Sequence, residues 1–174
     1  MGRIKEPESA KLFMSVFTPE ESLFQQGLDA FHPLFGEIDF VSERFSFHLT
    51  DYYREEMGGP LFRQIDFVSE RFSFHLTDYY REEMGGPLFR HFITFERLIS
   101  RALLSEIKQT TNRLEGKFAN AQGNRRLNID PGYLCLEHVI LATTKSYTHR
   151  PYLKDGIYAD LTLIYRNKSY QPLE

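Results

Sequence analysis

The chain of 174 residues contains no tryptophan and a single cysteine, Cys135. One cysteine excludes an internal disulfide framework and provides no cysteine pair for a zinc site. No stretch approaches the roughly 18 uninterrupted apolar residues of a membrane-spanning helix, and the opening segment lacks the apolar core of a signal peptide. From these absences we expect a cytoplasmic protein with no membrane partner.

An excess of either charge is also lacking, because 21 Lys and Arg stand against 24 Asp and Glu, for a net charge of -3. Proteins that bind phosphate backbones usually carry a basic excess, so composition gives nucleic-acid binding no support. The P-loop motif G-x-x-x-x-G-K-[ST] is absent, since Gly116-Lys117 is followed by Phe118 and has no upstream glycine at the required spacing. Any nucleotide binding therefore needs another architecture.

Aromatic residues are plentiful, with 16 Phe and 10 Tyr, and they suffice for a core in one domain spanning 1–174. Residues 38–63 recur letter for letter at 65–90, whereas solenoid repeats diverge between copies. The repeat has three possible origins: a natural duplication, an engineered duplication or a sequence error. A core shaped around one repeat copy has no room for a second copy. We therefore expect residues of about 51–77 to be the surplus that is displaced from the core, and the alternative is displacement of one whole copy.

Hydrophobic periodicity predicts the element order β-α-β-β-α-β-β-β. We expect strands over 11–18, 38–49 and 91–98, helices over 20–35 and 100–119, and three β-rich runs after residue 124, separated by turns at 130–132 and 154–156. Helical crossovers followed by late hairpins are typical of an α+β two-layer sandwich with a mainly antiparallel sheet. The first six elements fit a ferredoxin-like split βαβ.

The segment 128–158 holds the highest density of chemically active side chains, on or beside predicted strand ends. Loops held by a rigid sheet are where binding sites tend to lie, and cations there bind a phosphate or carboxylate. The structural alternative is that 130–132 is an ordinary turn and that the cations pair with nearby acids. The candidates are Lys145, Arg150, Tyr133 and Tyr152 for ligand binding, Asp130 and His149 for acid-base catalysis, and Asp130 with Asp155 for a metal.

Two motifs in the repeat invite a catalytic interpretation. His48-Leu49-Thr50 and His75-Leu76-Thr77 are similar to the H-x-T motifs of two-histidine phosphoesterases. Both come from one duplicated segment, so we interpret them as strand histidines. The acidic runs 51–56 and 78–83 have two interpretations, a solvated face and the completion of a metal site.

With one repeat copy set aside, several phrases resemble the prokaryotic family of the domain of unknown function 4416. They include TDYYREEMG, IKQTTNRLEGKFA, RRLNIDPGYL and LATTKSYTHRPYL, and the likeness covers nearly the whole chain. The family brings no established activity, although a GTP-binding label accompanies similar proteins. Relatives continue beyond YQPLE into a Trp-Thr-Tyr-Pro-Asp-Tyr phrase, so the resemblance implies a missing C-terminal tail.

Two functions are consistent with these features. One is the binding of a phosphorylated small molecule or nucleotide in a pocket formed by 130–155, with or without catalysis. The alternative is a non-catalytic protein- or RNA-binding module that uses exposed Tyr and Phe as anchors. The sequence implies no particular cofactor and no oligomeric state.

Overall fold

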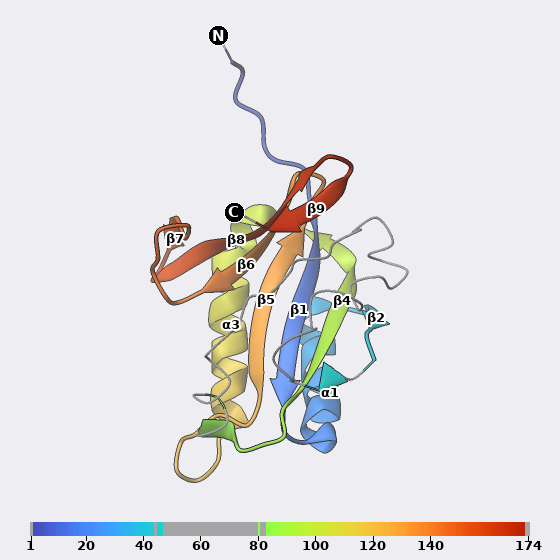
Figure 1. Ribbon diagram of the computed structural model, residues 1–174, viewed down its shortest axis with the longest axis vertical. Helices are drawn as coiled ribbons and strands as arrows, with labels where there is room; N and C mark the ends of the chain where they lie inside the picture. Colours follow the sequence, from blue (N-terminus) through green and yellow to red (C-terminus); the bar gives the residue numbers. More distant parts are fainter. Residues whose placement is uncertain (1, 44, 47–79, 81–82, 173–174) are drawn as a thin grey trace.

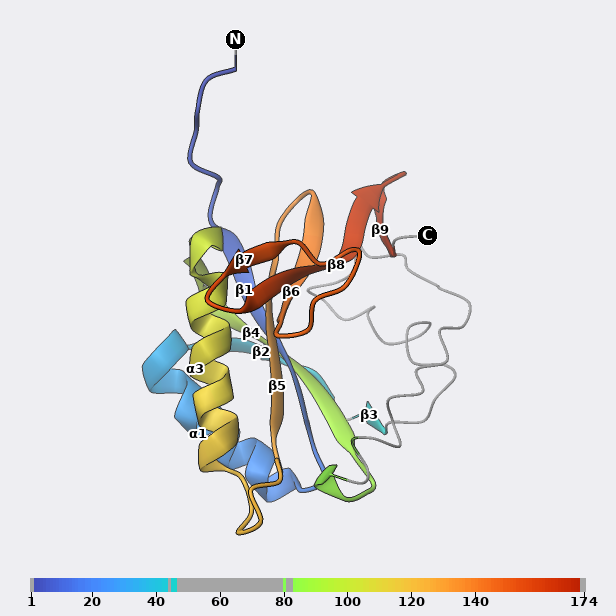
Figure 2. The same cartoon turned by 90° about the vertical axis from the view of Figure 1, so that its left-hand side faces the viewer.

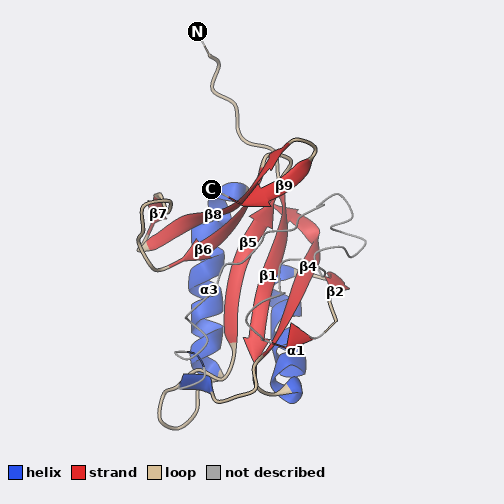
Figure 3. Cartoon of the chain, in the orientation of Figure 1, coloured by secondary structure: helices blue, strands red, loops and turns tan. Residues whose placement is uncertain are grey.

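The computed structural model describes residues 2–43, 45–46, 80 and 83–172. Within them, nine strands form one sheet and two α-helices cover one of its faces (Figure 1, Figure 3). The elements are β1 Ala10–Thr18, α1 Glu21–Phe35, β2 Ile38–Val41, β3 Phe45–Ser46, β4 Phe89–Ile99, the 3-10 helix η1 Arg101–Leu103, α3 Leu104–Lys117, β5 Asn128–Leu134, β6 His138–Thr143, β7 Tyr152–Lys154, β8 Ile157–Arg166 and β9 Ser169–Pro172.

The strand order is β2-β4-β1-β5-β6-β8-β7, with β3 paired to β4 and β9 paired to β8. Each of these pairings is antiparallel. Strand β4 lies between β1 and β2, and β1 lies between β4 and β5, so the units β1-α1-β2 and β4-α3-β5 interleave. This arrangement is the ferredoxin-like split βαβ, and it confirms the predicted α+β class.

The main core lies between the sheet and the two helices, which are on the same side of the sheet (Figure 2). Side chains alternate along β1, so Leu12, Met14 and Val16 all face the helices. Apolar residues at helical spacing, such as Phe24 and Phe31 in α1, are fully buried against them. Among the described helices, none combines the length and the apolar character needed to cross a membrane.

The opposite face of the sheet is also partly covered. Phe13 packs there with Val139, Leu163 and Tyr170 from β6, β8 and β9. Nearer the other end of β1, Phe17 packs with Met84 and Leu88, just before β4. This second face carries the charged residues described below.

The expected turn at 130–132 is wrong, because β5 runs through these residues as a regular strand. Pro131 lacks an N–H group, and its pairing partner in β1 is Met14. Pairing of β5 with β6 begins only at Gly132, so Pro131 occupies a stretch of open strand edge, where proline is tolerated. Gly132 allows the ring of Phe13 to lie directly against the strand.

The chain instead reverses at 135–137, inside a run that the sequence pattern assigned to one strand. The turn expected at 154–156 is confirmed between β7 and β8. Asp155 and Gly156 have φ angles of 54° and 77° there, which suits a tight hairpin turn.

Both repeat copies contribute to the described domain. Ile38–Val41 of the first copy form β2, whereas Met84 and Leu88 of the second copy pack on Phe17. The proposed surplus at 51–77 lies outside the described residues, as do both H-x-T motifs and the acidic runs apart from Tyr80 and Glu83.

Candidate functional site

The sheet face opposite the helices carries several of the predicted site residues. Asp160 on β8 is paired with Leu141 on β6, and Leu141 is paired with Gly132 on β5. Gly132 is in turn paired with Phe13, which packs against Leu141 on this face. Directly paired residues share a face and side chains alternate along a strand, so Asp160 and Asp130 both belong to the face opposite the helices.

The loop between β6 and β7 places Arg150 and His149 beside Asp160. Arg150 Nε donates a hydrogen bond to Asp160 Oδ2 at 2.8 Å, and His149 Nε2 lies 3.5 Å from Asp160 Oδ1. Arg150 Nη1 also donates to the main-chain oxygen of Lys145 at 3.5 Å. A guanidinium has five N–H donors, so these contacts orient Arg150 and leave donors for an anion.

A second charged group surrounds Asp130. Arg125 Nε and Nη2 donate to the two carboxylate oxygens of Glu83, each at 2.7 Å. Arg125 Nη1 donates to Asn128 Oδ1 at 2.7 Å, and Asn128 Nδ2 donates to Asp130 Oδ2 at 2.9 Å. The hydrogen bonds from Arg125 lower the pKa of Glu83, with a smaller contribution from the charge of Lys145. Lys145 therefore lies close enough to influence this group.

Two buried side chains of α3 support the same region of β5. Lys108 Nζ donates to the main-chain oxygen of Ile129 at 2.8 Å and lies 3.3 Å from Asp130 Oδ1. Glu115 Oε1 accepts a hydrogen bond from the N–H of Ile129 at 2.6 Å. Burial raises the pKa of Glu115, against the opposing charge of Lys108. The helix thus provides hydrogen-bond partners for the backbone of β5 along an edge that β6 does not reach.

Ser15 on β1 lies directly opposite Asp130 in the strand pairing. Its side chain is buried, and Oγ has no hydrogen-bond partner among the residues that the structure describes. A buried hydroxyl without a partner costs about 1–3 kcal/mol. Such a group fits a site where a polar ligand supplies the partner.

Two exposed tyrosines accompany the cationic loop. Tyr152 on β7 is paired with Tyr158, which precedes Asp160 by two residues and therefore shares its face. Tyr152 is 59% exposed and Tyr147 is 67% exposed. The centre of the Tyr147 ring lies 6.0 Å from Arg150 Cζ, so an aromatic surface adjoins the guanidinium.

The other two predicted residues lie elsewhere. Tyr133 packs in the cluster beneath Leu104, on the helix side of the sheet, and its hydroxyl lies 3.3 Å from His138 Nε2. Asp155 accepts a hydrogen bond from Gln109 of α3 at 3.4 Å. The structure therefore places Asp130 on the same sheet face as Asp160. Lys145, His149, Arg150 and Tyr152 accompany Asp160, whereas Tyr133 and Asp155 lie elsewhere.

Several residues of this region were not anticipated from the sequence. Lys108, Thr111 and Glu115 are buried and spaced by three and four residues, so they share one face of α3. Charged residues beside the apolar Ile107 and Leu114 were a usable signal for buried polar contacts. Arg125, Asp160 and Ser15 gave no comparable signal, whereas Glu83 belongs to the acidic run 78–83 noted above.

One group in the described part of the chain has three metal-ligand side chains with donor atoms within 4.8 Å of one another. It consists of Cys135, Glu137 and His138. These residues lie in and beside the turn between β5 and β6, at the opposite end of β5 from Asn128.

The family model described as a domain of unknown function, DUF4416, matches residues 8–65 and 60–174. The two matches overlap within the repeated region, which is compatible with a duplicated segment. No curated protein and no solved structure matches the chain. Because the family model matches well over half of its residues, the chain belongs to the DUF4416 family.

Proposed function

We propose that the chain is a cytoplasmic protein that binds a phosphorylated small molecule, with a nucleotide as the class that fits best. The binding surface is the sheet face opposite the helices. One observation carries this proposal: Lys145, His149 and Arg150 gather on the face that also bears Asp130 and the Ser15 hydroxyl, which has no hydrogen-bond partner among the described residues.

Arg150 supplies the main phosphate contact in this proposal. Its Nε is held at 2.8 Å by Asp160, which fixes the plane of the guanidinium before a ligand arrives. Arginine forms paired, charge-assisted hydrogen bonds with phosphate oxygens, and a preoriented fork loses less side-chain entropy on binding. Lys145 adds positive charge from the same loop, and His149 adds an imidazole nitrogen within 3.5 Å of Asp160 Oδ1.

The exposed tyrosines favour a nucleotide over a simple sugar phosphate. Tyr147 adjoins Arg150. Tyr152, which directly follows Pro151, lies on the same sheet face as Asp160. Stacking of a base on an aromatic ring contributes about 1–3 kcal/mol and does not need a P-loop. Asp130 and His149 are the proton acceptors on this face if the bound molecule reacts.

A non-catalytic protein- or RNA-binding module is the second candidate. It draws on the same observation of exposed Tyr147 and Tyr152 beside an arginine. Tyrosine and arginine are enriched at the energetic centres of protein interfaces, and aromatic rings stack unpaired RNA bases.

Thermal unfolding of the whole chain separates these functions. The probes are GTP, ATP, AMP, inorganic phosphate and a single-stranded RNA oligonucleotide. A ligand at 100 times its Kd stabilises the folded state by about 2.7 kcal/mol. We expect a nucleotide to raise the Tm, with the increase at least halved in Arg150→Ala and Lys145→Ala.

Arg113→Ala is the matched control, because this exposed arginine lies on α3, across the sheet from the proposed surface. It should leave the nucleotide-induced shift intact. Absence of any shift, or an equal shift in Arg150→Ala, contradicts small-molecule binding on this face. An increase in Tm with RNA but with none of the small molecules supports the alternative of a binding module.

A further inference from the structure

The hairpin turn between β5 and β6 is held rigidly. The N–H of Cys135 donates to the main-chain oxygen of His138 at 3.1 Å, which closes the turn. From β9, the hydroxyl of Tyr170 donates to the main-chain oxygen of Cys135 at 2.6 Å. The thiol of Cys135, a carboxylate oxygen of Glu137 and a ring nitrogen of His138 lie within 4.8 Å of one another.

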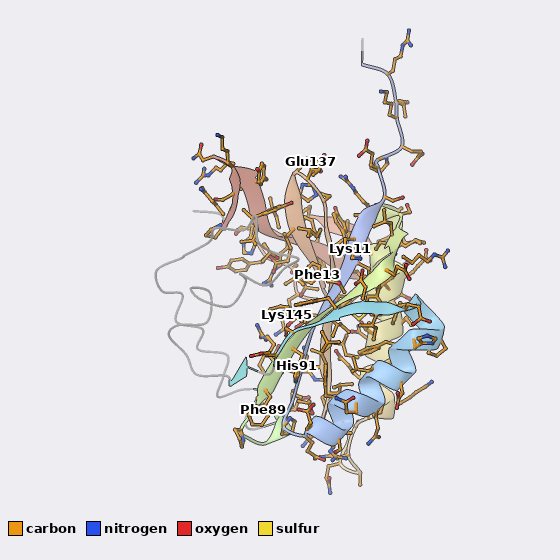
Figure 4. All side chains as sticks on the ribbon, turned by 90° about the vertical axis from the view of Figure 1, so that its right-hand side faces the viewer. Lys11, Phe13, Phe89, His91, Glu137 and Lys145 are labelled. Carbon is orange, nitrogen blue, oxygen red and sulfur yellow. The ribbon has the colours of Figure 1, made fainter. Side chains whose placement is uncertain are left out.

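A pocket of about 280 Å³ adjoins this turn, and its walls include Cys135 and Glu137. Lys11 and Arg101 also line it, from β1 and η1. Glu137 and Lys11 lie toward one end of the sheet, with Lys145 farther along it (Figure 4). The pocket is therefore distinct from the proposed nucleotide surface, and it has room for an ion with an additional ligand.

We propose that Cys135, Glu137 and His138 form a zinc site whose fourth position opens into this pocket. Sulfur, imidazole nitrogen and carboxylate oxygen are the three donor types that Zn²⁺ takes in proteins. Bond lengths of about 2.0–2.3 Å place the donors of a tetrahedral site about 3.5 Å apart. The observed spread of up to 4.8 Å needs only small side-chain rotations to reach that geometry.

His138 is prepared for this role. The hydroxyl of Tyr133 lies 3.3 Å from Nε2, so binding of the ion through Nδ1 would keep this contact. A hydrogen-bond partner on the second ring nitrogen is a regular feature of metal-binding histidines, because it fixes the ring orientation.

Glu137 is available at small cost. Its carboxylate contacts Arg101 Nη2 at 3.3 Å, and the glutamate side chain is 62% exposed. An exposed ion pair contributes little, so the carboxylate can turn toward the ion without a large loss.

The thiol of Cys135 is the sulfur donor of the group, and it lines the pocket into which the fourth position opens. Zn²⁺ displaces the thiol proton: the S–H bond breaks, a zinc–sulfur bond forms, and the proton passes to solvent.

Cobalt absorption tests the site, because Co²⁺ occupies zinc sites and its thiolate complexes have a charge-transfer band. Cys135 is the only cysteine in the chain, so such a band has one possible origin. We expect one equivalent of Co²⁺ to produce the band and Zn²⁺ to abolish it by displacement. Cys135→Ser should abolish the band, and His138→Gln should weaken Co²⁺ affinity by about 10- to 100-fold.

His149→Gln is the control, since it removes a histidine from the other region and should leave the band unchanged. Thiol alkylation of the wild-type chain provides a readout that does not depend on the folding of a variant. Zn²⁺ should slow alkylation of Cys135. Absence of the band, its persistence in Cys135→Ser, or an alkylation rate unaffected by Zn²⁺ overturns the zinc site.

Discussion

Gly132 lies so close to Ile140 that a Cβ atom at position 132 would be 2.3 Å from the main-chain oxygen of Ile140. It would also be 2.7 Å from two ring carbons of Phe13. Because the nearest atom belongs to the backbone of the paired strand, it cannot rotate away. Gly132→Ala should therefore lower the free energy of unfolding by about 2 kcal/mol or more, measured by urea denaturation.

Gly116→Ala is the matched control for this substitution. Gly116 lies within α3, and apart from its chain neighbours and the nearby helix backbone, no atom lies within 4 Å of the position that its Cβ would occupy. Alanine is favoured over glycine in a helix interior by about 0.8–1.0 kcal/mol, so this variant should be more stable than the wild type. Equal losses from both variants would show that strand crowding at Gly132 is not the cause.

The architecture was predictable from the sequence because its signals are local. The β1 run, the Thr18-Pro19-Glu20-Glu21 helix start and the Asp155-Gly156 turn depend on neighbouring residues only. The path of β5 was not predictable, because an Asp-Pro-Gly string normally favours a turn. Its extended form depends on Lys108 and Glu115. These side chains of α3, which are distant in the sequence, hydrogen-bond the backbone of Ile129 on the open edge of the strand.

The candidate site was predictable to the same extent. Lys145, His149 and Arg150 occupy a polar loop between two apolar runs, which is a local pattern. Their neighbours were not predictable, since Arg125 and Glu83 are 42 residues apart and meet only in the folded chain. Pairing across the sheet likewise brought Asp160 to Arg150.

The ion pair of Arg125 with Glu83 should stabilise the fold measurably. Both side chains are partly buried, at 28% and 21% exposed, and the guanidinium uses two parallel hydrogen bonds. A double-mutant cycle with Arg125→Ala and Glu83→Ala should give a coupling free energy of about 1–3 kcal/mol at neutral pH. The exposed pair of Lys154 with Glu106 is the control and should show no measurable coupling. Equal coupling in the two cycles would contradict a special role for Arg125.

Glu115 should make the wild type lose stability as pH rises. Its pKa in the folded state is raised above the ordinary value of 4.5, so the folded state binds more protons than the unfolded state across that interval. Stability therefore falls as pH rises from 4.5 through the folded pKa. Glu115→Gln retains an oxygen acceptor for the N–H of Ile129 and removes this titration. The variant should gain stability relative to the wild type as pH rises through this interval, measured by urea denaturation at several pH values.

Glu83→Gln is the control of opposite sign. Arg125 lowers the folded pKa of Glu83, so its contribution is present above the ordinary value of 4.5 and is lost as pH falls through the folded pKa. This variant should lose stability relative to the wild type as pH rises. A pH-independent difference for Glu115→Gln would show that the folded pKa of Glu115 is not raised.

Ser15→Ala should cost nothing in the absence of a ligand. The Ser15 hydroxyl is buried without a described partner, so its removal leaves no hydrogen bond unmade and is expected to add up to about 1 kcal/mol to the free energy of unfolding. Thr18→Val is the matched control on the same strand, because the Thr18 hydroxyl donates to the main-chain oxygen of Arg126 at 2.8 Å. That variant should lose about 1 kcal/mol.

With a nucleotide bound, the order of stability of Ser15→Ala and the wild type should change. Ser15→Ala should gain less stabilisation from the nucleotide than the wild type. If Ser15→Ala loses as much free energy of unfolding as Thr18→Val without any ligand, the Ser15 hydroxyl stabilises the fold and is not part of the binding surface.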